Sequence, residues 1–433
     1  MKNLIFLILA TLLITFCQPK TVDLSIDNIA EKYVRLVLDI GQYDVSFVDA
    51  YFGPDEWKIK DKKSVVFPSD EFIQTASELQ EQCDNLLKKE VSDSEEYRLT
   101  WLIKQLIAVK TKVEMMAGRL YDFDDEAQRL YDVKPPSFSE AHFDSLHQRL
   151  DSILPGKQAL SKRHLNYSKQ FIIPADKLDT IFKVAIAEAR KRTNKYLQLP
   201  ENEEFVLEYV NDKSWGAYNY YLGNGQSKIQ INTDIRFTIE KVIDLACHEG
   251  YPGHHVFMTL LDNNLYKEKG WVEYSIYPLF SPLSLISEGC ANFGIESTFP
   301  KLERIQFEQE FLFPLAGIDP SKIDQYYMVQ EIKTELDYVN NEVARKYLNK
   351  EINHDEAVKR LEKYLLFDHE TALRRILFID EYRSYVINYN LGQDMVSHYI
   401  DSLGGTSDKP EIRWSLFGDM LKNPLTPSRL ADH

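Results

Sequence analysis

The stretch His248-Glu-Gly-Tyr-Pro-Gly-His-His255 holds three of the chain's 10 histidines within eight residues. Two histidines four residues apart on a helix share one Zn²⁺ ion, with zinc–nitrogen distances of about 2.0–2.1 Å. Here the residue four positions after the first histidine is Pro252, which cannot bind a metal. In a straight helix, histidines six or seven positions further on are rotated or displaced too far to share an ion with His248.

Pro252 and Gly253 interrupt the helix between the histidines. Proline removes a helical hydrogen bond, and glycine allows backbone angles that other residues avoid. A two-residue bulge at this point would bring His254 into the place of the usual second ligand. We therefore predict His248 and His254 as metal ligands, with His255 as the alternative to His254.

The flanking residues complete a candidate zinc site. Apolar residues at helical spacing in 238–247 predict a helix that delivers His248 and Glu249 at its end. Glu288, in a Ser-Glu-Gly word after an expected helix start, is the predicted third ligand, which leaves the fourth position for water. Glu249 is the expected general base on that water. Asn292, one turn after Glu288, could orient either histidine.

Helical periodicity dominates the rest of the chain. Residues 204–233 differ, because they carry few helix signals, and the alternation in 227–233 predicts a strand. We expect a mainly α protein with a large helical metallopeptidase-like fold and a small β-sheet next to the zinc-binding helix. The strand could also bind an extended substrate at its edge. Helices are predicted at 28–40, 95–116, 138–154, 176–196, 321–347 and 354–366.

The chain begins with a predicted targeting segment, residues 1–17, in which an apolar run follows Lys2. The run is too short to span a membrane comfortably and is typical of a secretory signal. Its last residue, Cys17, resembles the acylated cysteine of bacterial lipoproteins, although Phe16 replaces the usual small residue. We expect an exported protein that is lipid-anchored in the bacterial envelope, with plain secretion as the alternative.

Three further segments are expected after the signal. Residues 18–25 form a short tether, residues 26–170 an N-terminal helical layer, and residues 171–433 a catalytic metallopeptidase region. The last two could form one continuous core.

Composition excludes some classes of function. The formal net charge of −16 argues against nucleic-acid binding, which needs clustered Lys and Arg. A hydrophobic content of 44% is typical of a globular protein. Beyond Cys17 the cysteines are odd in number and have no repeating spacing, so a disulfide framework is not expected.

The words His-Glu-x-x-Pro-Gly-His-His and Ser-Glu-Gly-x-Ala resemble those of the bacterial family called domain of unknown function 885, which is related to the gluzincin metallopeptidases. The segment Val48-Asp-Ala-Tyr-Phe-Gly-Pro54 and residues 387–392 are similar to further segments of that family, so the resemblance spans about residues 30–405. The chain departs from the family at Cys290, where an aromatic residue is usual, and at Ile295, where an acidic residue is expected.

The resemblance implies a zinc-dependent peptide hydrolase with a peptide as its substrate. In this interpretation Glu249 activates the water, zinc polarises the carbonyl group, and Tyr389 of the Tyr-x-x-Gly segment donates to the oxyanion. Two alternatives stay open: a surface protein that binds zinc without catalysis, and a hydrolase of a cell-wall amide. The presence of Glu249 favours catalysis, since a pure binding site needs no base beside a ligand.

Overall fold

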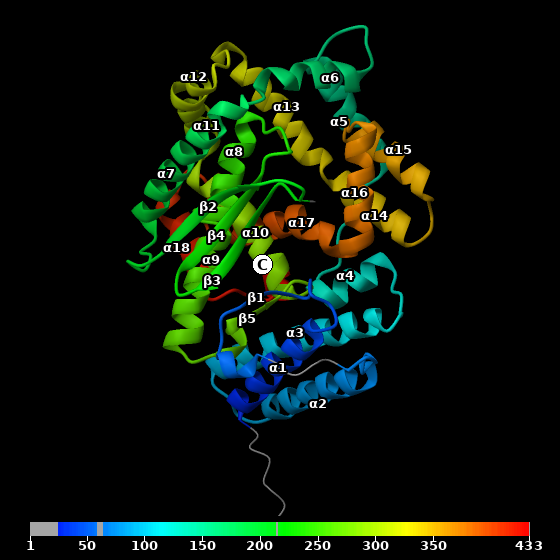
Figure 1. The fold of residues 1–433 in the computed structure, drawn as a ribbon, viewed down its shortest axis with the longest axis vertical. Helices are drawn as coiled ribbons and strands as arrows, with labels where there is room; N and C mark the ends of the chain where they lie inside the picture. The colour runs from blue at the N-terminus through cyan, green and yellow to red at the C-terminus, as the bar shows by residue number, and fades with distance from the viewer. Residues whose placement is uncertain (1–24, 59–63, 214, 433) are drawn as a thin grey trace, which may run out of the picture.

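The computed structural model describes residues 25–58, 64–213 and 215–432 (Figure 1). The predicted signal segment, Cys17 and all but the last residue of the predicted tether lie outside these ranges. No helix in the described part of the chain is long and apolar enough to cross a membrane.

The prediction of a mainly α fold with a small β-sheet is confirmed (Figure 1). The first helices are α1 (Ile26–Gly41), α2 (Ser69–Leu87), α3 (Asp93–Met116), α4 (Phe123–Tyr131), α5 (Glu140–Ile153), α6 (Leu160–Ser168) and α7 (Leu178–Tyr196). Around the candidate site follow α8 (Ile239–Leu245), α9 (His254–Leu261) and α10 (Pro282–Thr298). The remaining helices are α11 (Lys301–Phe307), α12 (Phe313–Ala316), α13 (Ile323–Leu336), α14 (Tyr338–Leu348), α15 (His354–Tyr364), α16 (His369–Tyr382), α17 (Ile387–Ser402), α18 (Pro410–Lys422) and α19 (Pro427–Ala431).

The prediction of one continuous helix over 321–347 is wrong. The chain forms two helices here, α13 and α14, which meet at Asp337. The backbone N–H of Asp337 donates to the carbonyl of Thr334, three residues back rather than four, at 3.2 Å. This tight turn contains neither Gly nor Pro, so the sequence pattern carries no sign of it.

A three-stranded sheet lies beside the candidate site, with strand order β2 (Glu204–Val210), β4 (Gln226–Asn232) and β3 (Ala217–Gly223). Strand β2 runs parallel to β4, and β3 pairs with β4 antiparallel. The turn between β3 and β4 needs positive φ, which Gly223, Asn224 and Gly225 supply at 87°, 56° and 71°. Because β4 is the central strand, both of its edges are already paired. The expectation that residues 228–233 offer an edge to substrate is therefore wrong, and the unpaired edges of this sheet belong to β2 and β3.

A second, two-stranded pairing connects the N-terminal part of the chain to the segment just before α10. Strand β1 (Val48–Tyr51) pairs antiparallel with β5 (Ile276–Pro278). Buried side chains from both sides of residue 170 belong to one continuous core, in which Leu99 and Leu285 are both fully buried. Figure 1 shows α1, α2 and α3 together at one end of the molecule, and α5, α6 and α13 at the other. The three-stranded sheet, α10 and α17 lie between these groups (Figure 1).

Candidate metal centre

The predicted bulge replaces the helix between the two histidines. Helix α8 continues into η4 (Ala246–Gly250), a π-helical turn that carries His248 and Glu249, and α9 begins at His254. Gly253 folds back against this turn, where its N–H donates to the carbonyl of Cys247 at 2.9 Å. A Cβ atom on Gly253 would lie only 1.9 Å from the carbonyl oxygen of His248, so no other residue fits there. Pro252, linked to Tyr251 by a cis peptide bond, completes the turn.

The three predicted ligands converge on one point. His248 and His254 place their Nε2 atoms 3.1 Å apart. Glu288, from the middle of α10, places Oε2 at 3.3 Å from Nε2 of His248 and Oε1 at 3.7 Å from Nε2 of His254. Four ligands at about 2.0–2.1 Å around a tetrahedral Zn²⁺ ion are separated from one another by ~3.3–3.4 Å. The residues therefore fit a tetrahedral zinc ion with three protein ligands.

Hydrogen bonds to Nδ1 orient both imidazoles toward the metal position. Asn292 accepts from His248, with Nδ1 and Oδ1 at 2.9 Å, and donates from its Nδ2 to the carbonyl of Tyr389 at 2.8 Å. This second bond fixes the orientation of the amide, so Nδ1 of His248 carries the proton and Nε2 keeps its lone pair. Ser287 Oγ lies 3.1 Å from Nδ1 of His254 and can act in the same way. Asn292 is thus a positioning residue for His248, one of the two histidines that the sequence analysis considered.

His255, the alternative second ligand, lies outside this cluster. Its side chain is fully buried, and its Nδ1 lies 2.8 Å from Oγ of Ser227 on β4. Its Nε2 lies 2.9 Å from Oε2 of Glu203, the residue before β2. The hydroxyl of Tyr251 donates to the same carboxylate oxygen at 2.6 Å. His255 therefore holds the bulge to the sheet, while His254 belongs to the metal cluster.

Glu249 lies beside the ligands on the same π-helical turn and is 5% exposed. Burial raises the pKa of the Glu249 carboxyl to about 7. The charge of Glu288 adds to this rise, and His248 opposes it. The backbone carbonyl of Glu249 accepts from Nδ2 of Asn219, on β3, at 2.7 Å. Its carboxylate makes no hydrogen bond or ion pair with another described residue, which leaves both oxygens available to a water molecule or a substrate.

The charges of the site favour a cation at its centre. Burial alone would lower the pKa of His248, but Glu288 and Glu249 raise it to about 9. Burial lowers the pKa of His254 to about 4, against an opposing effect of Glu288. The pKa of Glu288 itself is lowered, because the two histidines and the hydroxyl of Tyr385 outweigh its burial. The site without metal thus draws a proton to the place where a metal cation would lie.

Helix α17 closes the site from the other side. The hydroxyl of Tyr385, in the turn before α17, donates to Oε1 of Glu288 at 2.8 Å. Gly289 on α10 and Gly392 on α17 lie against each other, and a Cβ on Gly289 would come within 2.4 Å of the Gly392 carbonyl oxygen. The glycines of the Ser-Glu-Gly and Tyr-x-x-Gly words thus let these two helices approach closely enough to seat Glu288.

The predicted oxyanion donor, Tyr389, lies at the same crossing. Its ring is 5.8 Å from that of Tyr385, and its hydroxyl makes no hydrogen bond with another described residue. Burial and the charge of Glu288 raise the pKa of Tyr389 well above its usual range, so the phenol stays protonated and can donate. Three positioning residues, Ser287, Asn219 and Tyr385, were not predicted. Only Ser287 had a signal, since it begins the Ser-Glu-Gly word.

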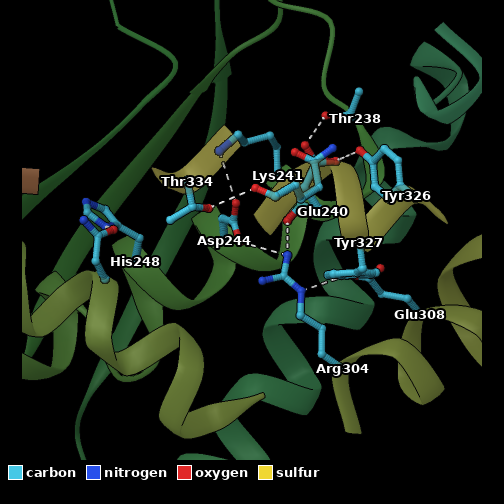
Figure 2. A network of polar contacts seen from close by, with 12 residues as sticks. Thr238, Glu240, Lys241, Asp244, His248, Arg304, Glu308, Tyr326, Tyr327 and Thr334 are labelled. Carbon is cyan, nitrogen blue, oxygen red and sulfur yellow. Dashed lines mark hydrogen bonds and ion pairs between the residues drawn. The ribbon is translucent and has the colours of Figure 1, made fainter. Parts of the chain in front are cut away.

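A separate polar network holds α8, the helix that leads to His248 (Figure 2). Arg304 on α11 donates to the carbonyl of Glu240 at 2.8 Å and pairs with Asp244 at 2.9 Å. Its Nε also pairs with Glu308 at 3.1 Å, and the hydroxyl of Tyr327 donates to the same Glu308 oxygen at 2.6 Å. One guanidinium group thus braces a turn of α8 immediately before the metal ligand.

Comparison with known proteins finds a similar fold but indicates no activity. No family model matches the chain, and no curated protein matches it. A candidate lipoprotein from Colwellia psychrerythraea has a similar structure, with a TM-score of 0.52 and 13% identity over 83% of this chain. This chain spans 65% of the length of that protein. A candidate lipoprotein of unknown function from Shewanella oneidensis gives a TM-score of 0.49, with 13% identity over 84% of this chain and 71% of the other.

Proposed function

We propose that this chain is a zinc-dependent peptidase of the bacterial envelope, related to the family called domain of unknown function 885. The observation that carries the proposal is the convergence of His248, His254 and Glu288 at separations expected for tetrahedral zinc. Glu249 lies beside them with both carboxylate oxygens available, which is the arrangement that a general base requires.

The residues of the site have separate tasks in hydrolysis. When bound, the zinc ion supplies Lewis acidity to the carbonyl oxygen and lowers the pKa of water. Glu249 accepts the proton of the attacking water and passes it to the leaving amine. The hydroxyl of Tyr389 donates to the carbonyl oxygen as negative charge develops there. Asn292 keeps His248 in the required tautomer, and Ser287 can accept from Nδ1 of His254 in the same way.

The position of β3 supports a peptide as the substrate. Its free edge presents backbone N–H and C=O groups to which an extended chain can pair. Asn219 connects this strand directly to the backbone of Glu249 at 2.7 Å. A peptide paired with β3 would therefore pass close to the general base.

The location belongs to the same proposal. The N-terminal signal ends in Cys17, and the fold is similar to that of a candidate lipoprotein. We propose export, with a lipid anchor on Cys17.

The test combines metal analysis with a digest of a peptide library. The parent and Glu249→Gln should each hold close to one zinc per chain, while hydrolysis by Glu249→Gln falls by ~10²–10⁴, since the amide cannot accept the proton. Glu201→Gln, at an exposed position, is the matched control and should behave as the parent. Unchanged hydrolysis by Glu249→Gln would refute the mechanism. If the parent holds zinc but cleaves no peptide, a zinc-binding surface protein or a cell-wall amide hydrolase becomes the better interpretation.

A further inference from the structure

The segment Val48–Pro54 resembles the domain of unknown function 885 family, yet none of its residues has a task in the proposed hydrolysis. In the structure, Val48 pairs with Pro278 and Ala50 with the adjacent Tyr277, so Asp49 is the extra residue of a β-bulge. Bulges turn one side chain out of the regular alternation of a strand and often occur next to active sites. The bulge gives Asp49 an orientation that a regular strand would not.

The rest of the segment forms a tight turn that anchors this bulge. The hydroxyl of Tyr51 donates to the carbonyl of Pro54 at 2.8 Å, and Phe52 N donates to the carbonyl of Ser275 at 3.0 Å. A Cβ on Gly53 would lie 2.5 Å from Oγ of Ser275. The turn residues therefore have structural reasons to be present, and Asp49 is the ionisable side chain that this turn positions.

Asp49 lies in surroundings of tyrosines and carboxylates. The hydroxyl of Tyr218, the neighbour of Asn219 on β3, donates to Oδ1 of Asp49. Burial, and then the charges of Glu288 and Glu249, raise the pKa of Asp49 to about 7. No described Lys, Arg or His forms an ion pair with it.

The charge balance of the site points to a cation from the substrate. This step rests on the proposed function. Since no described cationic side chain pairs with Asp49, its counter-charge could come from the substrate. A carboxylate that already accepts from a tyrosine hydroxyl can accept a charge-assisted hydrogen bond from an ammonium group on its other side. Strand β3, next to Asp49, also has a free edge on which an extended peptide could lie.

We propose that Asp49 binds the free α-ammonium group of the substrate, so that the protein cleaves peptides from their amino end. Asp49 adds no bond-making step. It contributes a charge-assisted hydrogen bond that a blocked amino terminus cannot form.

The test measures binding separately from turnover, in the zinc-loaded Glu249→Gln protein. Titration calorimetry compares trialanine with N-acetyl-trialanine. Acetylation should weaken binding by ~10–100-fold, the range of a hydrogen bond to a charged group. Adding Asp49→Asn should make the two affinities similar without loss of zinc, because the amide oxygen can still accept from Tyr218.

Two further variants protect the interpretation from simple misfolding. Asp44→Asn is the matched control, since Asp44 lies shortly before this segment but pairs with Lys112 at 3.1 Å, and it should keep the preference for the free amine. Tyr218→Phe keeps the ring, removes the hydroxyl that orients Asp49, and should reduce the preference by a smaller factor.

Several results would overturn the proposal. Equal binding of both peptides before Asp49 is changed, or no binding of either, would exclude ammonium recognition. Loss of zinc in Asp49→Asn would make Asp49 a metal ligand instead. If the Glu249→Gln protein prefers the free amine while the parent hydrolyses no peptide, the ammonium site stands and the peptidase function fails.

Discussion

His254 and His255 are adjacent in the sequence, and the structure gives them separable effects on stability. In His255→Ala, Ser227 loses a partner at 2.8 Å and Glu203 one at 2.9 Å. Breaking a buried pair costs roughly 3–5 kcal/mol. Glu203 keeps Arg190 at 2.5 Å and Tyr251 at 2.6 Å, so its carboxylate is not left bare. We therefore expect the low end of that range, about 3 kcal/mol, with or without zinc.

His254→Ala should behave in the opposite way. Without metal the protein loses the contacts of His254 with Ser287 and with Nε2 of His248, both at 3.1 Å and together worth about 1–2 kcal/mol. With zinc at a thousand times the parent's Kd, the parent gains about 4 kcal/mol of stability by mass action. His254→Ala should gain almost none of this, because it lacks a ligand, whereas His255→Ala should gain most of it.

Urea unfolding of each variant, once with a chelator and once with zinc, measures both the metal-free stability and the gain on zinc binding. His354→Ala is the control, since that side chain is 51% exposed and its partner is Asp355 rather than a residue of the sheet. The reasoning is refuted if His255→Ala keeps the parent's stability without metal yet loses the zinc-dependent gain. That result would make His255 the ligand.

Two other predictions concern the bulge and the N-terminal helices. Gly253→Ala should weaken zinc binding at least tenfold in a competition titration, because its Cβ would meet the carbonyl of His248 at 1.9 Å. Gly216→Ala should leave zinc binding unchanged, because its Cβ would meet its nearest neighbour at an ordinary 3.6 Å. Equal losses of zinc affinity in the two variants would contradict the argument. Burial, with the charge of Lys333, lowers the pKa of His164 to about 3, so the unfolded chain binds more protons than the folded one between that value and about pH 6.5. The contribution of His164 to the free energy of unfolding is present above pH 6.5 and is lost as the pH falls, by about 2 kcal/mol at pH 5. His164→Gln should therefore lose about 2 kcal/mol less stability than the parent between these two pH values, and urea unfolding at each pH measures the difference.

Local patterns in the sequence were sufficient for several of the longer helices and for the chemistry of the motif. Helix α1, for example, covers the 28–40 stretch whose apolar residues recur at helical spacing. Periodicity reports which face of a segment is apolar, and that is enough to place a helix. It says nothing about breaks made by backbone geometry alone, so the separation of α13 from α14 at Asp337 was missed.

The candidate site divides in the same way. The spacing of His248, Pro252 and Gly253 required a bulge, because the ligand geometry of zinc is incompatible with a straight helix through these residues. The sequence alone could not decide which of His254 and His255 faces His248. That choice depends on Ser227 and Glu203, which hold His255 to the sheet and lie far away along the chain.

Long-range packing decided the remaining features. The close approach of Gly289 and Gly392 sets the hydroxyl of Tyr385 against Glu288, and no local pattern distinguishes this tyrosine among the 25 in the chain. Strand order also follows from pairing between distant segments, which is why the alternating stretch at 227–233 became the central strand. A sequence determines each segment's own conformation and chemistry through neighbours a few residues away. Which segments then meet is determined by the burial of all of them together, and only the tertiary structure shows it.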